Sequence, residues 1–183
     1  MHYSVLKFFF HVTSANCLKN HRILEIGSYN VNGSVRPIIE ATMGPVTYTG
    51  IDMREGPCVD LVLSAEQVAA HFGAEQFDAV ICFEALEHIK DWKAAISNMK
   101  TVLKSGGTLY LTTRSKGFPL HSYPDDYWRF EVADMKTIFN DFVTQVYLDP
   151  DWPGVFVHAM KPLGWMPALD LTNYSVYSME NEK

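Results

Sequence analysis

The sequence predicts an α/β fold, a Rossmann-like, doubly wound sheet of seven strands, mostly parallel, with an antiparallel hairpin at the C-terminal end. Three observations lead to this prediction. Short apolar runs alternate along the chain with segments whose apolar residues recur at helical spacing. Residues 77–83 are apolar nearly throughout, as expected of a strand covered on both faces. The last two apolar runs flank a turn-rich segment, residues 149–154, which indicates a hairpin.

The first half of the chain contains the first strand and helix pairs. The first strand ends at Gly27, where a tight turn leads into a helix whose apolar residues share one face. The second strand ends at Asp52, and the third leads directly into the next helix. We expect strands at residues 22–26, 46–51 and 59–63, and helices at residues 34–43 and about 65–72.

The second half continues the alternation around one long loop. Asp91 can cap a helix that ends before Gly106 and Gly107. Residues 116–130 have neither a helix nor a strand period, so we interpret them as a folded loop, and such loops often carry function. The remaining elements are expected as strands at residues 77–83, 108–113, 143–148 and 155–160, and a last helix at residues 132–142.

Length and composition limit the function classes. A chain of 183 residues, 48% hydrophobic, can bury one sizeable core, so residues 1–183 are predicted to form a single domain. The net charge of −6 without a Lys/Arg cluster argues against nucleic-acid binding. Three widely spaced cysteines fit a reducing cytoplasm, and Lys7 and His11 bracket the apolar residues 8–10, so we expect a cytoplasmic protein without a membrane span.

Residues 25–34 have the position of a cofactor-binding loop, after the first strand and at the start of the first helix. Gly27 lets the chain turn tightly, and Gly33 and the helix N-terminus offer unpaired N–H groups. Asp52, at the end of the second strand, is placed to accept both hydroxyl hydrogens of a ribose. The pattern indicates a cofactor that contains a nucleoside.

The loop separates two classes of cofactor. A dinucleotide site favours the spacing G-x-G-x-x-G, whereas Tyr29 and Asn32 interrupt it here. The carboxylate of Glu25 would repel a phosphate but suits an amino group of a ligand. A cationic cofactor without phosphate therefore fits better than NAD, and S-adenosylmethionine, with its sulfonium, α-amino group and ribose, is such a cofactor.

At this point the chain resembles the class I S-adenosylmethionine-dependent methyltransferases, in particular small type 11-like enzymes of bacteria and their viruses that share a segment like residues 123–130. The resemblance implies one methyltransferase domain with a core at about residues 20–160 and peripheral residues 1–20 and 162–183. The matching segments, in the order of the family, are residues 24–28, Asp52, and residues 77–82, 86–89 and 103–109.

The same resemblance assigns cofactor-binding residues. Glu25 and its neighbours lie along the methionine part, Asp52 binds the ribose, and the segment around Ser64 borders the adenine. The glycine motif of the family is broken at Tyr29 and Val31, so other residues must complete the loop. The implied cofactor-binding residues are Glu25, Gly27, Ser28, Asn30, Gly33, Asp52, Met53, Ser64, Ala65, Glu66 and Phe83.

His88 and His121 are the candidate catalytic residues. Methyl transfer is an in-line displacement, and alignment supplies much of the acceleration. If the acceptor is a hydroxyl, a neutral His88 could take its proton, although His88 could instead cap or brace the helix. A metal site formed by His88, His121 and an aspartate is an alternative, but no metal-ligand spacing supports it, so no metal site is predicted.

The loop at residues 116–130 is the candidate acceptor site. Its polar side chains among aromatic residues suit a hydroxylated substrate. Arg129 has an alternative role, because it could pair with Asp125 or Asp126 and hold the loop shut. The candidate substrate-binding residues are Tyr123, Asp126, Tyr127 and Arg129.

These observations predict an S-adenosylmethionine-dependent methyltransferase that acts on a small-molecule or carbohydrate acceptor, at oxygen. Two alternatives stay open, a catalytically silent module that binds the cofactor and a nicotinamide-dependent oxidoreductase. We expect no nucleic-acid or membrane partner, and the sequence leaves a homo-oligomer open.

Overall fold

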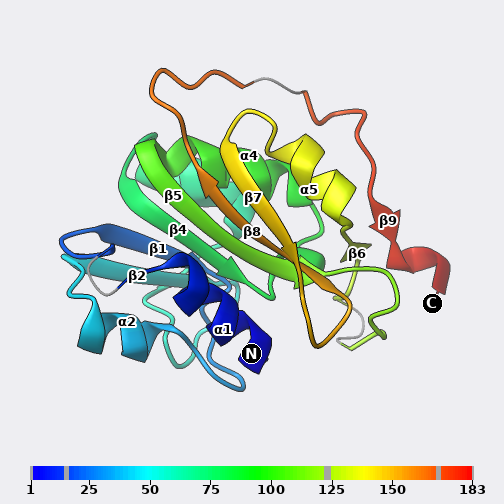
Figure 1. Ribbon diagram of the computed structural model, residues 1–183, viewed down its shortest axis with the longest axis horizontal. Helices are drawn as coiled ribbons and strands as arrows, with labels where there is room; N and C mark the ends of the chain where they lie inside the picture. The colour runs from blue at the N-terminus through cyan, green and yellow to red at the C-terminus, as the bar shows by residue number, and fades with distance from the viewer. Residues whose placement is uncertain (1, 15–16, 122–124, 168–169, 183) are drawn as a thin grey trace.

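The structure is a computed structural model that describes residues 2–14, 17–121, 125–167 and 170–182. Its main feature is a central sheet of seven strands with helices on both faces (Figure 1). The strands of this sheet are β1 (Arg22–Ile26), β2 (Thr47–Asp52), β3 (Leu61–Val62), β4 (Phe77–Phe83), β5 (Leu103–Arg114), β7 (Val143–Leu148) and β8 (Gly154–Met160).

The strands follow the order β3-β2-β1-β4-β5-β8-β7 across the sheet. β8 runs antiparallel to its neighbours β5 and β7, and the other pairs are parallel. The predicted fold class, a mostly parallel doubly wound sheet with a C-terminal hairpin, is therefore confirmed. The strand order reverses between β1 and β4, and ligands of such sheets bind outside the carboxyl ends of the strands at this reversal.

Two apolar layers hold the helices on the sheet. Because side chains alternate along a strand, Ile23 and Ile81 face one layer, and Leu24 and Val80 face the other. In the ranges that the structure describes, no helix has the length and apolar character needed to cross a membrane. The first layer contains α1 (Tyr3–Val12) and α2 (Arg36–Thr42), and the second contains α3 (Val68–Phe72), α4 (Trp92–Val102) and α5 (Val132–Ile138).

The helix α1 is an element that the sequence analysis did not predict. Its Val5 and Phe9 are fully buried, and the ring of Phe9 packs edge-to-face on Phe83 at 5.8 Å. The hydroxyl of Ser4 donates to the carboxylate of Asp149 over 3.1 Å. The apolar N-terminal segment is therefore one of the helices that cover the sheet.

Several predicted boundaries shift. The predicted strand at residues 59–63 shortens to β3, since Asp60 turns its carboxylate to the N–H of Gly50, 2.7 Å away. β5 begins at Leu103, earlier than the expected residue 108. In the described ranges, the short 3₁₀ turns η1 (Ala65–Gln67) and η2 (Leu86–His88) lead into α3 and α4, and η3 (Met179–Glu182) follows β9.

A second, two-stranded sheet was also not predicted. It pairs β6 (Trp128–Arg129), at the end of the long loop, with β9 (Tyr177–Ser178), near the C-terminus. The segment after β8 passes the side of the sheet that holds α4 and α5 before it reaches β9 (Figure 1). There Trp165 donates to Asp141, and Tyr174 donates to Asp134 of α5. These contacts tie the C-terminal segment to α5 and the turn after it, and the pairing of β9 with β6 ties it to the loop that carries the candidate acceptor residues.

Candidate active site

The turn after β1 lies against the segment that follows β4. The N–H groups of Gly27 and Ser28 both donate to the carbonyl of Ile51 over 3.0 Å, which ties the carboxyl ends of β1 and β2 together. Gly27 has a φ of +76°, and a Cβ atom there would lie 2.4 Å from the Cβ of Ala85. Glycine at this position therefore lets the two strand ends approach each other.

The rest of the loop is closed by an asparagine. The Oδ1 atom of Asn30 accepts from the N–H of Gly33 over 2.8 Å, and the N–H of Asn30 donates to the carbonyl of Pro57 over 2.9 Å. These contacts stabilise the turn although Tyr29 and Val31 replace two glycines of the family motif. The side chain of Asn30 thus closes the turn between residues 30 and 33.

Asp52 projects from the end of β2 toward this loop. Its Oδ2 atom accepts from the N–H of Tyr29 over 3.3 Å, and its Oδ1 atom accepts from the N–H of Arg54 over 3.1 Å. A carboxylate has about four lone-pair positions, so acceptor capacity remains for a ligand. The next side chain, Met53, is 72% exposed at the same edge.

Glu25 is buried at the end of β1, in the layer that contains α2. The hydroxyl of Tyr48 donates to its Oε2 atom over 2.9 Å. Burial raises the pKa of Glu25 to about 7, and the hydrogen bond from Tyr48 opposes that rise in part. Near neutral pH this carboxyl is therefore partly protonated.

The predicted adenine segment lies beside Asp52. The N–H of Leu63 donates to the carbonyl of Asp52 over 2.9 Å, which places Ser64 and Glu66 at the start of η1 near the end of β2. The side chain of Asn98 in α4 donates to the carbonyl of Ala65 over 2.9 Å and fixes this turn.

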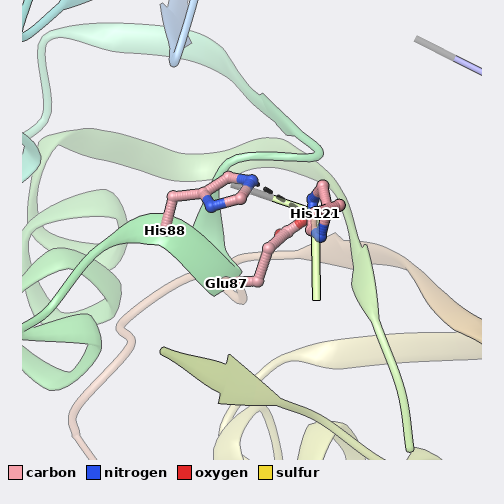
Figure 2. A group of neighbouring side chains, drawn as sticks. All are labelled: Glu87, His88 and His121. Atoms are coloured by element: carbon pink, nitrogen blue, oxygen red, sulfur yellow. Dashed lines mark ion pairs between the residues drawn. The ribbon is translucent and has the colours of Figure 1, made fainter. Parts of the chain in front are cut away.

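Figure 2 shows Glu87, His88 and His121 side by side, the first two from η2 and the third from the long loop. The imidazole rings of His88 and His121 have their centroids 4.7 Å apart. Nε2 of His88 lies 4.0 Å from Oε1 of Glu87. The two predicted catalytic histidines are thus neighbours at the carboxyl edge of the sheet, next to the contact between Gly27 and Ala85.

Both imidazoles lie against oxygen atoms of the long loop. Nδ1 of His88 lies 2.5 Å from the carbonyl oxygen of Asp125, and Nδ1 of His121 lies 2.9 Å from Oδ2 of Asp126. Burial and the neighbouring His88 lower the pKa of His121. His121 therefore favours its neutral form more than an exposed histidine does.

The loop itself is held by a buried ion pair. Arg129 and Asp126 are both fully buried, and the guanidinium contacts both carboxylate oxygens, at 2.5 and 2.9 Å. Burial opposes ionisation of Asp126, but the hydrogen bonds from Arg129 outweigh it and hold the pKa of this carboxyl below its usual range. Arg129 also donates to the carbonyls of Phe118 and Pro119 over 3.1 to 3.3 Å.

The match to known proteins decides the family. Residues 4–149 match a family model described as a methyltransferase domain. The chain belongs to this methyltransferase family. Together with the fold, this match confirms the predicted enzyme class, a class I methyltransferase with S-adenosylmethionine as its cofactor.

Three relatives illustrate the likeness. Ubiquinone biosynthesis O-methyltransferases of Coxiella burnetii (strain Dugway 5J108-111) and Haemophilus ducreyi are 25% and 30% identical, over 90% and 59% of this chain. The chain spans 71% of the first of these proteins and 51% of the second. An S-adenosylmethionine-dependent methyltransferase of Mesorhizobium loti shares the fold, with a TM-score of 0.63, 14% identity, and coverage of 86% of this chain and 98% of that chain.

Within this methyltransferase, the predicted cofactor residues of the turn after β1 and of Asp52 to Glu66 gather at one edge of the sheet. Phe83 does not share this position, because its ring packs on Phe9 in the core. Contact of any predicted cofactor residue with the cofactor stays a prediction.

The predicted acceptor residues divide into an internal pair and a residue nearer the surface. Asp126 and Arg129 satisfy each other, which is the loop-closing alternative that the sequence left open. The hydroxyl of Tyr127 donates to Asp125 over 2.9 Å at a part-buried position. Tyr123 lies outside the described residues. Acceptor contact by these four residues stays a prediction.

Sequence reasoning did not assign a role to Glu87. Its side chain is fully buried, its Oε2 accepts from the hydroxyl of Thr113 over 2.8 Å, and its Oε1 has no hydrogen-bond partner among the described residues. The sequence did contain a signal for this role, because Glu87 directly precedes the candidate catalytic residue His88 and both residues follow the end of the strand at residues 77–83.

Proposed function

We propose that this methyltransferase transfers the methyl group of S-adenosylmethionine to an oxygen of a small hydroxylated acceptor, a small molecule or a carbohydrate. The observation that carries the proposal is the contact of Gly27 with Ala85. Ala85 precedes Glu87 by two residues and His88 by three. The contact therefore brings the loop with the candidate cofactor residues close to η2, which carries both side chains. A cofactor methyl group at this edge would face the histidine pair.

The reaction needs one bond to form while another breaks. The acceptor oxygen attacks the methyl carbon, the bond between that carbon and the sulfonium sulfur breaks, and its electron pair stays on sulfur, which leaves S-adenosylhomocysteine. The hydroxyl proton leaves to a nearby base or to water. In-line alignment supplies much of the rate, so positioning of the hydroxyl beside His88 and His121 is the main task of the protein.

The cofactor residues carry the other half of the proposal. Asp52 accepts from the ribose hydroxyls with the lone pairs that Tyr29 and Arg54 leave free. Gly27 and Ser28 follow the methionine part, and Ser64, Ala65 and Glu66 border the adenine. Met53 offers an exposed apolar surface next to Asp52.

The relatives support an oxygen target, since the curated relatives named above are O-methyltransferases of ubiquinone biosynthesis. A cavity of about 240 Å³ lies between the long loop and the C-terminal segment, and the candidate acceptor residue Arg129 is part of its lining, together with Lys116, Gly117, Phe118, Pro119, Tyr177 and Met179.

Calorimetric titration with S-adenosylhomocysteine and with NAD tests the cofactor, and transfer of labelled methyl groups to a panel of hydroxylated compounds tests the reaction. Asp52→Asn should weaken S-adenosylhomocysteine binding about 10- to 150-fold, because ribose hydrogen bonds to a charged group contribute about 1.5–3 kcal/mol. The exposed neighbour Glu55→Gln removes the same charge and should leave binding unchanged. Binding of NAD alone would overturn the proposal, and tight cofactor binding without methyl transfer to any acceptor would favour the silent module.

A further inference from the structure

The cluster of Glu87, His88 and His121 offers three metal-ligand atoms in one place. One ligand atom from each residue lies within 4.8 Å of the other two. Two of the residues come from η2 and the third comes from the loop that packs over it (Figure 2). The fold brings these residues together without a ligand spacing in the sequence, and it places Glu87, where the sequence alternative had an aspartate, beside the two histidines.

The contacts of the two imidazoles favour a free lone pair on Nε2 of each ring. A carbonyl oxygen can only accept, so the contact of His88 Nδ1 with Asp125 requires the proton on Nδ1 and leaves the lone pair on Nε2. Nδ1 of His121 lies 2.9 Å from the carboxylate of Asp126, and a proton on Nδ1 is favoured beside that negative charge, which leaves the lone pair on Nε2 of the second ring. Metal-binding histidines commonly donate their other N–H to such an oxygen, which fixes the ring and its tautomer.

Among the described residues, no lysine or arginine forms an ion pair with the carboxylate of Glu87, in contrast to the buried Asp126. Arg129 contacts both oxygens of the buried Asp126. The Oε2 atom of Glu87 has a partner in Thr113, whereas the fully buried Oε1 atom has none among the described residues. An unsatisfied buried carboxylate oxygen costs free energy, and this oxygen lies 4.0 Å from Nε2 of His88. A cation between the two atoms would remove that cost.

We propose that Glu87, His88 and His121 bind a divalent transition-metal ion of the zinc class at the carboxyl edge of the sheet. Two imidazole nitrogens and one carboxylate oxygen suit zinc and its neighbours, whereas magnesium and calcium prefer oxygen ligands throughout. A zinc ion holds its ligand atoms at about 2.0–2.2 Å, so these atoms lie closer to one another than the separations of up to 4.8 Å in this cluster. The three side chains would therefore move slightly toward a bound ion. Three protein ligands leave at least one coordination position open.

The open position gives the ion a role at the reactive end. A bound hydroxyl oxygen would be held beside the histidines, and the ion would ease loss of its proton to water before the oxygen attacks the methyl carbon. This role rests on the proposed methyl transfer, whereas binding of the ion rests only on the three side chains. The two claims are therefore tested separately.

The full chain, without an affinity tag and freed of metal by a chelator, is titrated with Zn²⁺ and in parallel with Mg²⁺ in a non-coordinating buffer. We expect one equivalent of Zn²⁺ per chain and much weaker Mg²⁺ binding. Glu87→Gln and His121→Asn should each weaken Zn²⁺ affinity at least about tenfold. Asparagine at 121 can keep the donor to Asp126 while it removes the second ring nitrogen. His71→Asn, at an exposed histidine of α3, is the matched control and should bind as the wild type does.

Absence of stoichiometric Zn²⁺ binding would overturn the metal site, as would equal affinities in wild type, Glu87→Gln and His121→Asn. If thermal unfolding shows that Glu87→Gln does not fold, His121→Asn on the loop decides alone. S-adenosylhomocysteine is then titrated into metal-free and metal-loaded protein. Cofactor binding without Zn²⁺ binding contradicts only the metal site, and Zn²⁺ binding without cofactor binding contradicts only the proposed methyl transfer.

Discussion

Gly27 lies so close to Ala85 that a Cβ atom on Gly27 would be 2.4 Å from the Ala85 Cβ. The backbone of Gly27 is also left-handed, with a φ of +76°. We expect Gly27→Ala to lower the free energy of unfolding by about 3 kcal/mol or more, from about 1–2 kcal/mol of backbone strain and a further clash. It should also weaken S-adenosylhomocysteine binding, since the turn moves. Urea unfolding and calorimetric titration measure the two effects.

Gly44 supplies the matched control. Its φ is +59°, and a Cβ atom there would have nothing within 4 Å. Gly44→Ala should therefore cost only the backbone strain, about 1–2 kcal/mol, and leave cofactor affinity unchanged. Equal losses of stability in the two variants would show that the contact with Ala85 adds nothing.

The sheet could be predicted because its strands have local signals. Residues 77–83 form β4 because a continuous apolar run fits a strand buried on both faces. The position of Asp52 at the carboxyl end of β2 was predictable because the apolar run before it ends there. The helix α1 could not be predicted in this way. Phe9 is fully buried only because Phe83 and Tyr110, far along the chain, form the surface on which it packs.

The candidate site is predictable in its cofactor half and much less so in its reactive half. The turn at Gly27 is readable from the glycine itself, since the position requires a positive φ. The approach of His121 to His88 depends on a loop conformation that Arg129 fixes through carbonyls of Phe118 and Pro119. Such contacts between side chains and distant backbone leave no periodic signal in the sequence.

Arg129 and Asp126 form a buried pair whose rupture should be costly. Arg129→Met would leave the Asp126 carboxylate buried without its partner, so we expect a loss of about 3–5 kcal/mol in the free energy of unfolding. The exposed pair of Lys7 and Asp151 is the control, with side chains 47% and 42% exposed. Lys7→Met should cost at most about 1 kcal/mol. Urea unfolding of both variants makes the comparison, and similar losses would contradict a structural role for the buried pair.

Glu25 should make stability depend on pH. Its pKa is about 7 in the folded protein and 4.5 in the unfolded chain, because burial disfavours the charged carboxylate. The folded state therefore binds the proton more tightly, and the stabilisation is complete below pH 4.5 and is lost as pH rises to about 7. Glu25→Gln carries no titrating group at this position. From pH 4.5 to 7.5 the variant should gain stability relative to the wild type by on the order of 3 kcal/mol.

Tyr48→Phe removes the hydrogen bond that lowers the pKa of Glu25, so the loss of stability in this variant should extend to higher pH. Urea unfolding across this pH range provides the measurement, and a constant difference between Glu25→Gln and wild type would show that Glu25 titrates normally.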